Sequence, residues 1–251
     1  MGSTRPVVLS IAGLDPCGGA GLLADIKTFE QYKVYGLGIS TAQTLQTENK
    51  FYCLRWETEE SILTAIETML SQYEVKAIKI GIVSTIDLLK NIVSFIHQKS
   101  NNIKIVLDPI IKSSSGFNFW NEKISQVELV EVLSKIYLIT PNYNEVVELL
   151  PSLDGEESAK KLSAYCNVLL KGGHNEEEIG VDYLYTKNKV EKIEAGTLSY
   201  FAKHGSGCVL SAAITANLAL GVELSKACVN AKKYTEQFLG STTTLLGYHH
   251  V

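Results

Sequence analysis

Short apolar runs alternate with longer segments of helical periodicity along almost the whole sequence. Runs rich in β-branched residues predict strands at residues 7–12, 37–45, 76–83, 104–111, 136–142 and 167–174. Between them, apolar residues recur every three or four positions, most clearly at Ile62, Ala65, Ile66, Met69, Leu70 and Tyr73. This alternation predicts an α/β fold with a mostly parallel central sheet and helices on both faces.

The last third of the sequence predicts a different arrangement. Residues 181–194 contain two short strand-like pieces around a polar turn at residues 186–189, which predicts a small hairpin at the sheet edge. Two helices follow, the first from Cys208 to about Leu220, where Gly221 is expected to end it. No repeat or long linker interrupts the 251 residues, so we expect a single domain over 1–251.

Composition narrows the classes of partner. The chain is 45% hydrophobic and 20% charged with a net charge of −4, which disfavours nucleic acid or an anionic membrane as partner. The longest apolar run, residues 209–220, is too short to span a bilayer, and no basic-then-apolar leader is visible. We therefore expect a soluble cytoplasmic protein.

The five cysteines do not form a familiar pattern. Their number is odd and no pair has C-x-x-C spacing, so neither a disulfide framework nor a zinc site is indicated. Cys53, Cys166 and Cys228 are expected to be plain buried thiols. Cys17 and Cys208 differ because each lies beside a glycine-rich loop.

The loop Gly205-Ser206-Gly207-Cys208 leads directly into an apolar helix. Gly205 and Gly207 allow positive φ and a close approach of a ligand, and the unpaired amides of a helix N-terminus attract anions. A thiol at that position is expected to have a lowered pKa, so Cys208 could accept a proton from an alcohol that attacks phosphorus. The alternative is a tight turn selected only for packing.

A second glycine-rich loop covers residues 13–21, after the first predicted strand. It matches neither the P-loop nor the dinucleotide-binding fingerprint. It brings Gly13, Asp15 and Asp25 near the expected ligand-binding edge of the sheet, although Asp25 could equally be a solvated helix carboxylate.

Polar residues also follow the later strands. Asp108, Asn142, Glu145 and Lys171 stand at the expected carboxyl ends of neighbouring strands. Carboxylates and an amide suit Mg²⁺, and a nearby lysine suits a polyphosphate, although each residue alone could be a cap or a surface residue. Together they favour phosphoryl transfer.

Five stretches resemble one family in order over about residues 7–240: "SIAGLDPCGGAGLLADIKTF", "VLDPI", "LITPNYNEV", "LLKGGH" and "HGSGCVLSAAITANLALG". They resemble the hydroxymethylpyrimidine/phosphomethylpyrimidine kinases of thiamine biosynthesis, in the ribokinase-like superfamily. The resemblance implies a homodimeric, ATP- and Mg²⁺-dependent kinase. Such a kinase would phosphorylate the hydroxymethyl group of 4-amino-5-hydroxymethyl-2-methylpyrimidine and then phosphorylate the monophosphate again.

The resemblance also implies roles for individual residues. Gly205, Ser206, Gly207 and Cys208 match the family's anion hole and catalytic cysteine. The positions that match the pyrimidine pocket are Gly13, Asp25 and Gln46, with Ile82 where methionine is common. Those on the nucleotide side are Asp108, Asn142, Lys171 and Gly172, with Glu145 and Asp108 as metal ligands.

The sequence departs from the family pattern at several places. Leu14 and Cys17 stand where serine is usual, and Lys203 and Ser206 stand where threonine is usual. Two other readings therefore stay open: a pyridoxal or pyridoxine kinase of vitamin B6 salvage, and a non-catalytic sensor of a pyrimidine or a nucleotide.

Overall fold

The computed structural model describes residues 5–112, 117–119, 125–151, 153–174, 178–196 and 200–250. The strands are β1 (Val7–Leu14), β2 (Tyr35–Gln46), β3 (Phe51–Trp56), β4 (Val75–Ile80), β5 (Lys104–Leu107), β6 (Leu138–Ile139), β7 (Asn167–Leu170), β8 (Asp182–Tyr185) and β9 (Val190–Ile193). The helices are α1 (Gly21–Gln31), α2 (Glu59–Gln72), α3 (Ile86–Lys99), α4 (Gln126–Leu133), α5 (Tyr143–Leu149), α6 (Gly155–Leu162), α7 (Ser206–Ala219) and α8 (Leu224–Gly240), with a 3₁₀ turn η1 (Gly172–His174).

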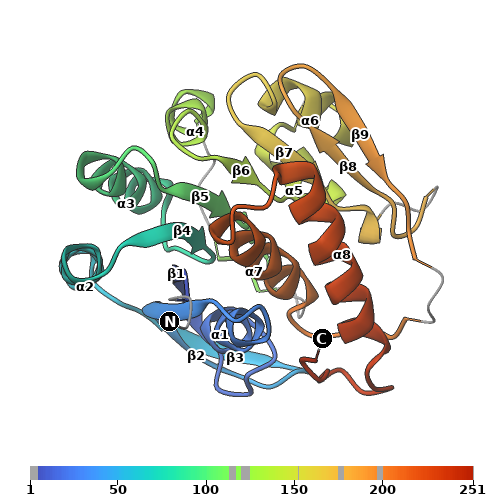
Figure 1. The fold of residues 1–251 in the computed structure, drawn as a ribbon, viewed down its shortest axis with the longest axis horizontal. Coiled ribbons are helices and arrows are strands. Elements are labelled where there is room, and N and C mark those ends of the chain that lie inside the picture. The colour runs from blue at the N-terminus through green and yellow to red at the C-terminus, as the bar shows by residue number, and fades with distance from the viewer. Residues whose placement is uncertain are drawn as a thin grey trace.

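Across this described part of the chain, the strands form one sheet in the order β3-β2-β1-β4-β5-β6-β7-β8-β9. The six strands from β2 to β7 run parallel to one another, whereas β3 and the β8–β9 hairpin are antiparallel at the two edges (Figure 1). The predicted mostly parallel sheet and edge hairpin are therefore confirmed.

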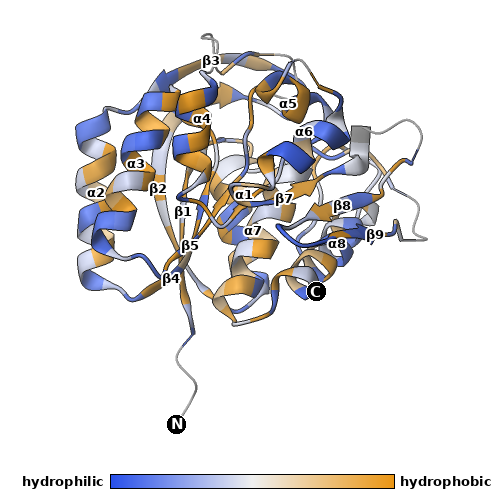
Figure 2. Ribbon diagram, turned by 90° about the horizontal axis from the view of Figure 1, so that it is seen from above, coloured by the Kyte–Doolittle hydropathy of each residue, from blue (hydrophilic) through white to orange (hydrophobic). Residues whose placement is uncertain are grey.

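Helices cover both faces of the sheet. Helices α2 to α6 lie on one face, and α1, α7 and α8 lie on the other (Figure 2). Helix α7 packs against the sheet, α1 and α8, which explains why its residues 208–218 are all buried. The apolar run that the sequence shows there is the centre of the second layer, and it places the first turn of α7 beside the strand ends.

The structure corrects several expected boundaries. The edge strand β3 was not predicted, because its inward and outward positions mix cysteine, leucine and arginine without clear alternation. Strand β5 ends at Leu107, one residue before Asp108, and β6 has only two residues. Asn142 caps helix α5 instead of ending a strand. The sequence also predicts a helix near residues 123–135, of which residues 123 and 124 lie outside the described residues.

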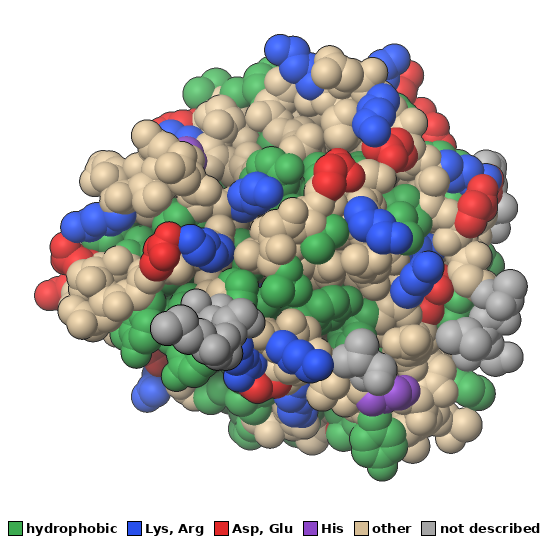
Figure 3. All heavy atoms as spheres, in the orientation of Figure 1, with side chains coloured by type: hydrophobic (Ala, Val, Ile, Leu, Met, Phe, Trp, Pro, Cys, Tyr) green, Lys and Arg blue, Asp and Glu red, His purple; other side chains and the backbone are tan. Residues whose placement is uncertain are grey.

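Exposure separates the cysteines. Cys166 and Cys228 are buried as expected, but Cys53 is exposed because it lies on the edge strand β3, so that prediction is wrong. On the face drawn in Figure 3, acidic and basic side chains are interspersed. Among the described residues, no helix is both long and apolar enough to cross a membrane.

Candidate active site

A cavity of about 180 Å³ lies where the carboxyl ends of β1, β4 and β5 meet the start of α7. Strand β1 is the point at which the strand order reverses, because β2 lies on one side of it and β4 on the other. Parallel α/β sheets place their ligands at such a point. The wall consists of Ala12, Gly13, Asp15, Ala20, Gly21, Thr44, Gln46, Lys79, Gly81, Ile82, Asp108, Ile110, Lys112, Phe119, Glu145, Lys171, His204, Gly205, Ser206, Gly207 and Cys208.

We call residues 205–208 the anion loop, and its two glycines have different functions. Gly205 has a φ of +78°, and a Cβ there would lie 2.0 Å from the Gly19 carbonyl oxygen, so only glycine fits. Gly207 is not left-handed but lies in the first turn of α7, where a Cβ would come 3.4 Å from Lys171 Nζ. Because first-turn amides have no intrahelical partner, they are available to an anion beside Lys171.

Cys208 lines the cavity but is buried, and its expected low pKa is not found. Burial raises the pKa of the Cys208 thiol to about 11, although Lys79 and the Gly21 backbone N–H act in the opposite direction. Loss of solvation outweighs the attraction of the nearby Lys79 ammonium group. The group is therefore a neutral thiol in the ligand-free protein at neutral pH.

Asp108, Glu145 and Lys171 form one charged cluster on the wall. Lys171 Nζ lies 3.0 Å from Asp108 Oδ1 and 3.5 Å from Glu145 Oε2, and Ser211 donates to Asp108 Oδ2 at 3.1 Å. Burial favours a raised pKa for Asp108, but Lys171 and Lys79 hold that pKa below its usual value. For Glu145, burial prevails and raises the pKa. Among the described residues, Lys171 is the only ammonium group in an ion pair with these two carboxylates, so the cluster can attract a further cation.

Asn142 and Gly172 are not on the cavity wall, but each lies beside a residue that is: Asn142 contacts Glu145, and Gly172 follows Lys171. Asn142 Oδ1 accepts from the Glu145 amide at 2.9 Å, and Glu145 Oε2 accepts from the Asn142 amide at 2.7 Å. The Gly172 amide donates to Asp182 Oδ1 at 2.8 Å, and a Cβ on Gly172 would lie 1.7 Å from the Val181 carbonyl oxygen. A direct contact of either residue with a nucleotide stays a prediction.

Asp25 is also absent from the wall. It is fully buried, so its interpretation as a solvated helix carboxylate is wrong. Both of its oxygens lie 2.8 Å from Lys79 Nζ, and Ser10 donates to Oδ2 at 2.6 Å. Burial alone would lower the pKa of Lys79, but Asp25 raises it well above its usual value. Asp25 therefore faces the cavity only through Lys79, and direct contact with a substrate stays a prediction.

The other three expected substrate residues lie together on the wall. A Cβ on Gly13 would lie 2.4 Å from Ile82 Cδ1, so glycine leaves the space that Ile82 occupies. Gln46 Nε2 donates to Thr44 Oγ1 at 3.0 Å. Ile82 and Phe119 belong to one apolar cluster. This half of the cavity combines an apolar wall with one amide side chain, which suits a flat heteroaromatic ring.

Sequence reasoning missed Lys79 and His204. Lys79 is a lysine inside an otherwise apolar strand, a signal that could have been used. His204 immediately precedes the glycine turn, and its Nε2 lies 3.0 Å from Asp15 Oδ2. Its backbone amide donates to the Leu245 carbonyl at 2.9 Å. Asp15 and His204 thus join the first glycine loop, the anion loop and the C-terminal segment.

Comparison with known proteins supplies the family. The profile of one family, described as phosphomethylpyrimidine kinase, matches residues 15–250 of this chain. The chain belongs to the phosphomethylpyrimidine kinase family. It is therefore a phosphotransferase.

Relatives of this kinase support the assignment over its whole length. The hydroxymethylpyrimidine/phosphomethylpyrimidine kinase of Aquifex aeolicus is 32% identical over 250 residues, which is 96% of this chain and 98% of the relative. The solved phosphomethylpyrimidine kinase of Clostridium difficile is 30% identical with a TM-score of 0.78, covering 93% of this chain and 99% of that one. The ADP complex of Bacillus subtilis pyridoxal kinase is 27% identical with a TM-score of 0.81, covering 98% and 97%. These neighbours confirm the expected ribokinase-like fold.

Proposed function

We propose that the chain transfers the γ-phosphoryl group of ATP to the hydroxymethyl group of 4-amino-5-hydroxymethyl-2-methylpyrimidine, and then to the resulting monophosphate. This proposal rests on one observation. The loop at residues 205–208, the Cys208 thiol and the Asp108–Lys171–Glu145 cluster line the same cavity as a small apolar surface. The names of the relatives supply the substrate class. A non-catalytic sensor of a pyrimidine or a nucleotide would not need all of these groups in one cavity.

Each part of the wall has a function in this reaction. The first-turn amides at Gly205–Cys208 hold the transferred phosphoryl group, and Lys171 adds a positive charge close to Gly207. The Gln46 amide offers a donor and an acceptor to the edge of an aminopyrimidine, while Ile82 and Phe119 exclude water around the ring. Cys208 takes the proton that leaves the substrate hydroxyl when Cys208 is in its thiolate form, which is the minor form at neutral pH.

The donor set also fits Mg²⁺. Asp108 and Glu145 offer carboxylate oxygens, and the single Lys171 ammonium does not neutralise both. These two residues would hold the ion, which supplies positive charge to the phosphates of the nucleotide. We also propose, from the family resemblance, that the enzyme is cytoplasmic and forms a homodimer. Light scattering of the purified protein tests the dimer.

The first test compares substrates. With Mg-ATP, we expect kcat/KM for the hydroxymethylpyrimidine to exceed that for pyridoxal by at least about tenfold, because the pocket is lined for a small aminopyrimidine. Product mass identifies the phosphate ester, and a reaction without alcohol measures background ATP hydrolysis. An equal or higher kcat/KM with pyridoxal would assign the chain to vitamin B6 salvage instead.

A second test addresses the metal. Glu145→Gln should raise the Mg²⁺ concentration required for half-maximal rate and lower kcat, because one negative charge is lost near the ion. Glutamine can keep the cap contact with the Asn142 amide, so the fold should be retained. Calorimetric binding of the pyrimidine without nucleotide should be unchanged. An equal loss of pyrimidine affinity would place Glu145 on the substrate side.

A third test concerns the monophosphate. Lys112 lines the cavity, and its partner Glu148 forms a half-exposed ion pair that costs little to break. Lys112→Met should raise KM for the monophosphate by about tenfold and leave KM for the alcohol nearly unchanged, since only the monophosphate is an anion. A parallel rise for both substrates would mean that Lys112 does not distinguish them.

A further inference from the structure

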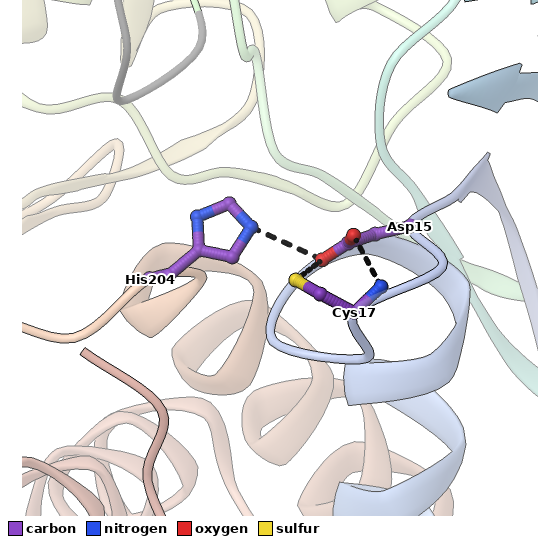
Figure 4. A group of neighbouring side chains, drawn as sticks. All are labelled: Asp15, Cys17 and His204. Carbon is purple, nitrogen blue, oxygen red and sulfur yellow. Dashed lines mark hydrogen bonds and ion pairs between the residues drawn. The ribbon is translucent and has the colours of Figure 1, made fainter. Parts of the chain in front are cut away.

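Three potential metal ligands meet beside the cavity: Asp15, Cys17 and His204 (Figure 4). His204 Nε2 lies 3.0 Å from Asp15 Oδ2, and Cys17 Sγ lies 3.1 Å from the same oxygen. The three ligand atoms all lie within 4.8 Å of one another. Asp15 and His204 are 189 residues apart, so no sequence spacing indicates this cluster.

We propose that this cluster is a binding site for a thiophilic divalent cation, with Zn²⁺ as its natural occupant. A thiolate, an imidazole nitrogen and one carboxylate oxygen form a ligand set typical of zinc. Zinc bonds of about 2.0–2.3 Å put tetrahedral ligand atoms about 3.3–3.7 Å apart. The two contacts to Asp15 therefore need to open by a few tenths of an ångström. The third pair, Cys17 Sγ and His204 Nε2, already lies within 4.8 Å and must settle in the same range.

The surroundings give the ion a path and a fourth ligand. Asp15 and His204 lie on the cavity wall, and Cys17 is partly exposed, so the ion can enter from solvent. Three protein ligands leave one tetrahedral position for water. The Asp15 carboxylate already accepts hydrogen bonds from the backbone amides of Cys17 and Ala20, which fix its orientation in the cluster.

Binding exchanges one proton for the metal. The Cys17 thiol loses its proton to solvent, because metals bind the thiolate. Before the metal enters, the Cys17 thiol donates a hydrogen bond to Asp15 Oδ2. His204 binds through Nε2, so the ring proton that Nε2 donates to Asp15 in the free protein moves to Nδ1, which has no hydrogen-bond partner among the described residues.

This site differs in chemistry from the proposed magnesium site. Asp108 and Glu145 offer only oxygen, whereas Asp15, Cys17 and His204 offer oxygen, sulfur and nitrogen. The inference does not depend on the proposed reaction, because binding is measured without nucleotide or substrate.

The test titrates Zn²⁺ into the whole protein by calorimetry, with Co²⁺ as a spectroscopic probe. The wild type should bind one Zn²⁺, and its Co²⁺ complex should show a thiolate-to-metal charge-transfer band. Cys17→Ser should weaken Zn²⁺ binding by at least about tenfold and remove the band. Cys53→Ser and Cys208→Ser serve as matched controls and should keep the wild-type Zn²⁺ affinity and the charge-transfer band.

A measurement on the wild type guards against a variant that fails to fold. Zn²⁺ should protect Cys17 from iodoacetamide, as mapped by peptide mass, while the exposed Cys53 stays reactive. Unchanged Zn²⁺ affinity in Cys17→Ser, or a band lost in Cys208→Ser, would overturn the proposal. So would alkylation of Cys17 at the same rate with and without Zn²⁺.

Discussion

Replacement of Cys208 by serine is expected to lower kcat by about 10²–10⁴, the usual contribution of general-base catalysis. Serine is nearly isosteric with cysteine, so the buried first turn of α7 should be preserved. Its hydroxyl is a far weaker base than a thiolate. Single-turnover measurements at saturating substrate check this result, with Cys53→Ser as the control at an exposed position away from the cavity wall.

The pH dependence follows from the raised pKa of Cys208. Since that pKa is about 11 in the free protein, the thiolate fraction rises about tenfold per pH unit through the neutral range. The logarithm of kcat/KM, which reports on the free enzyme, should rise with a slope near one from about pH 7 to 9. Cys208→Asp should be active at neutral pH without that slope. A flat wild-type profile, or Cys208→Ser within twofold of wild type, would remove the thiol from the reaction.

The second large effect is on stability. Lys79→Met should lower the free energy of unfolding by about 3–5 kcal/mol, because Asp25 is left as a buried carboxylate without its cation. Methionine approximates the volume of the lysine stem, so lost packing contributes little. Urea unfolding at constant pH measures the change as a shift of the midpoint.

The double variant Lys79→Met/Asp25→Leu is the control for this pair. It replaces both charges by apolar groups, and most of the lost stability should return. The difference between the double variant and the sum of the single variants gives the coupling free energy. Additive losses would mean that the two charges do not stabilise each other, despite the two 2.8 Å contacts.

Sequence periodicity predicted the parallel sheet, the hairpin and α7 because each has a strong local signal. It missed α5 because that helix has only seven residues and begins shortly after the two-residue strand β6, so neither element has a clear period. The pair Asn142 and Glu145 forms a capping box, a local pattern that also resembles a ligand pair. Pattern alone cannot separate these interpretations.

The candidate site was predictable where a residue follows a strand or starts a helix, as for Asp108, Lys171 and Cys208. It was not predictable where function depends on a partner far along the chain. Asp25 is positioned by Lys79, 54 residues away, and the pKa of Cys208 is set by burial that only the folded protein creates. Local reasoning from the helix N-terminus therefore gave the wrong direction for that pKa.

The contact between Asp15 and His204 spans 189 residues, and that between Thr28 and His249 spans 221. Closing such long loops is slow compared with forming the local helices and hairpins. During refolding, circular dichroism should therefore recover while the two glycine loops are still apart. For a recombinant preparation of this kinase, specific activity is a stricter measure of complete folding than helix content.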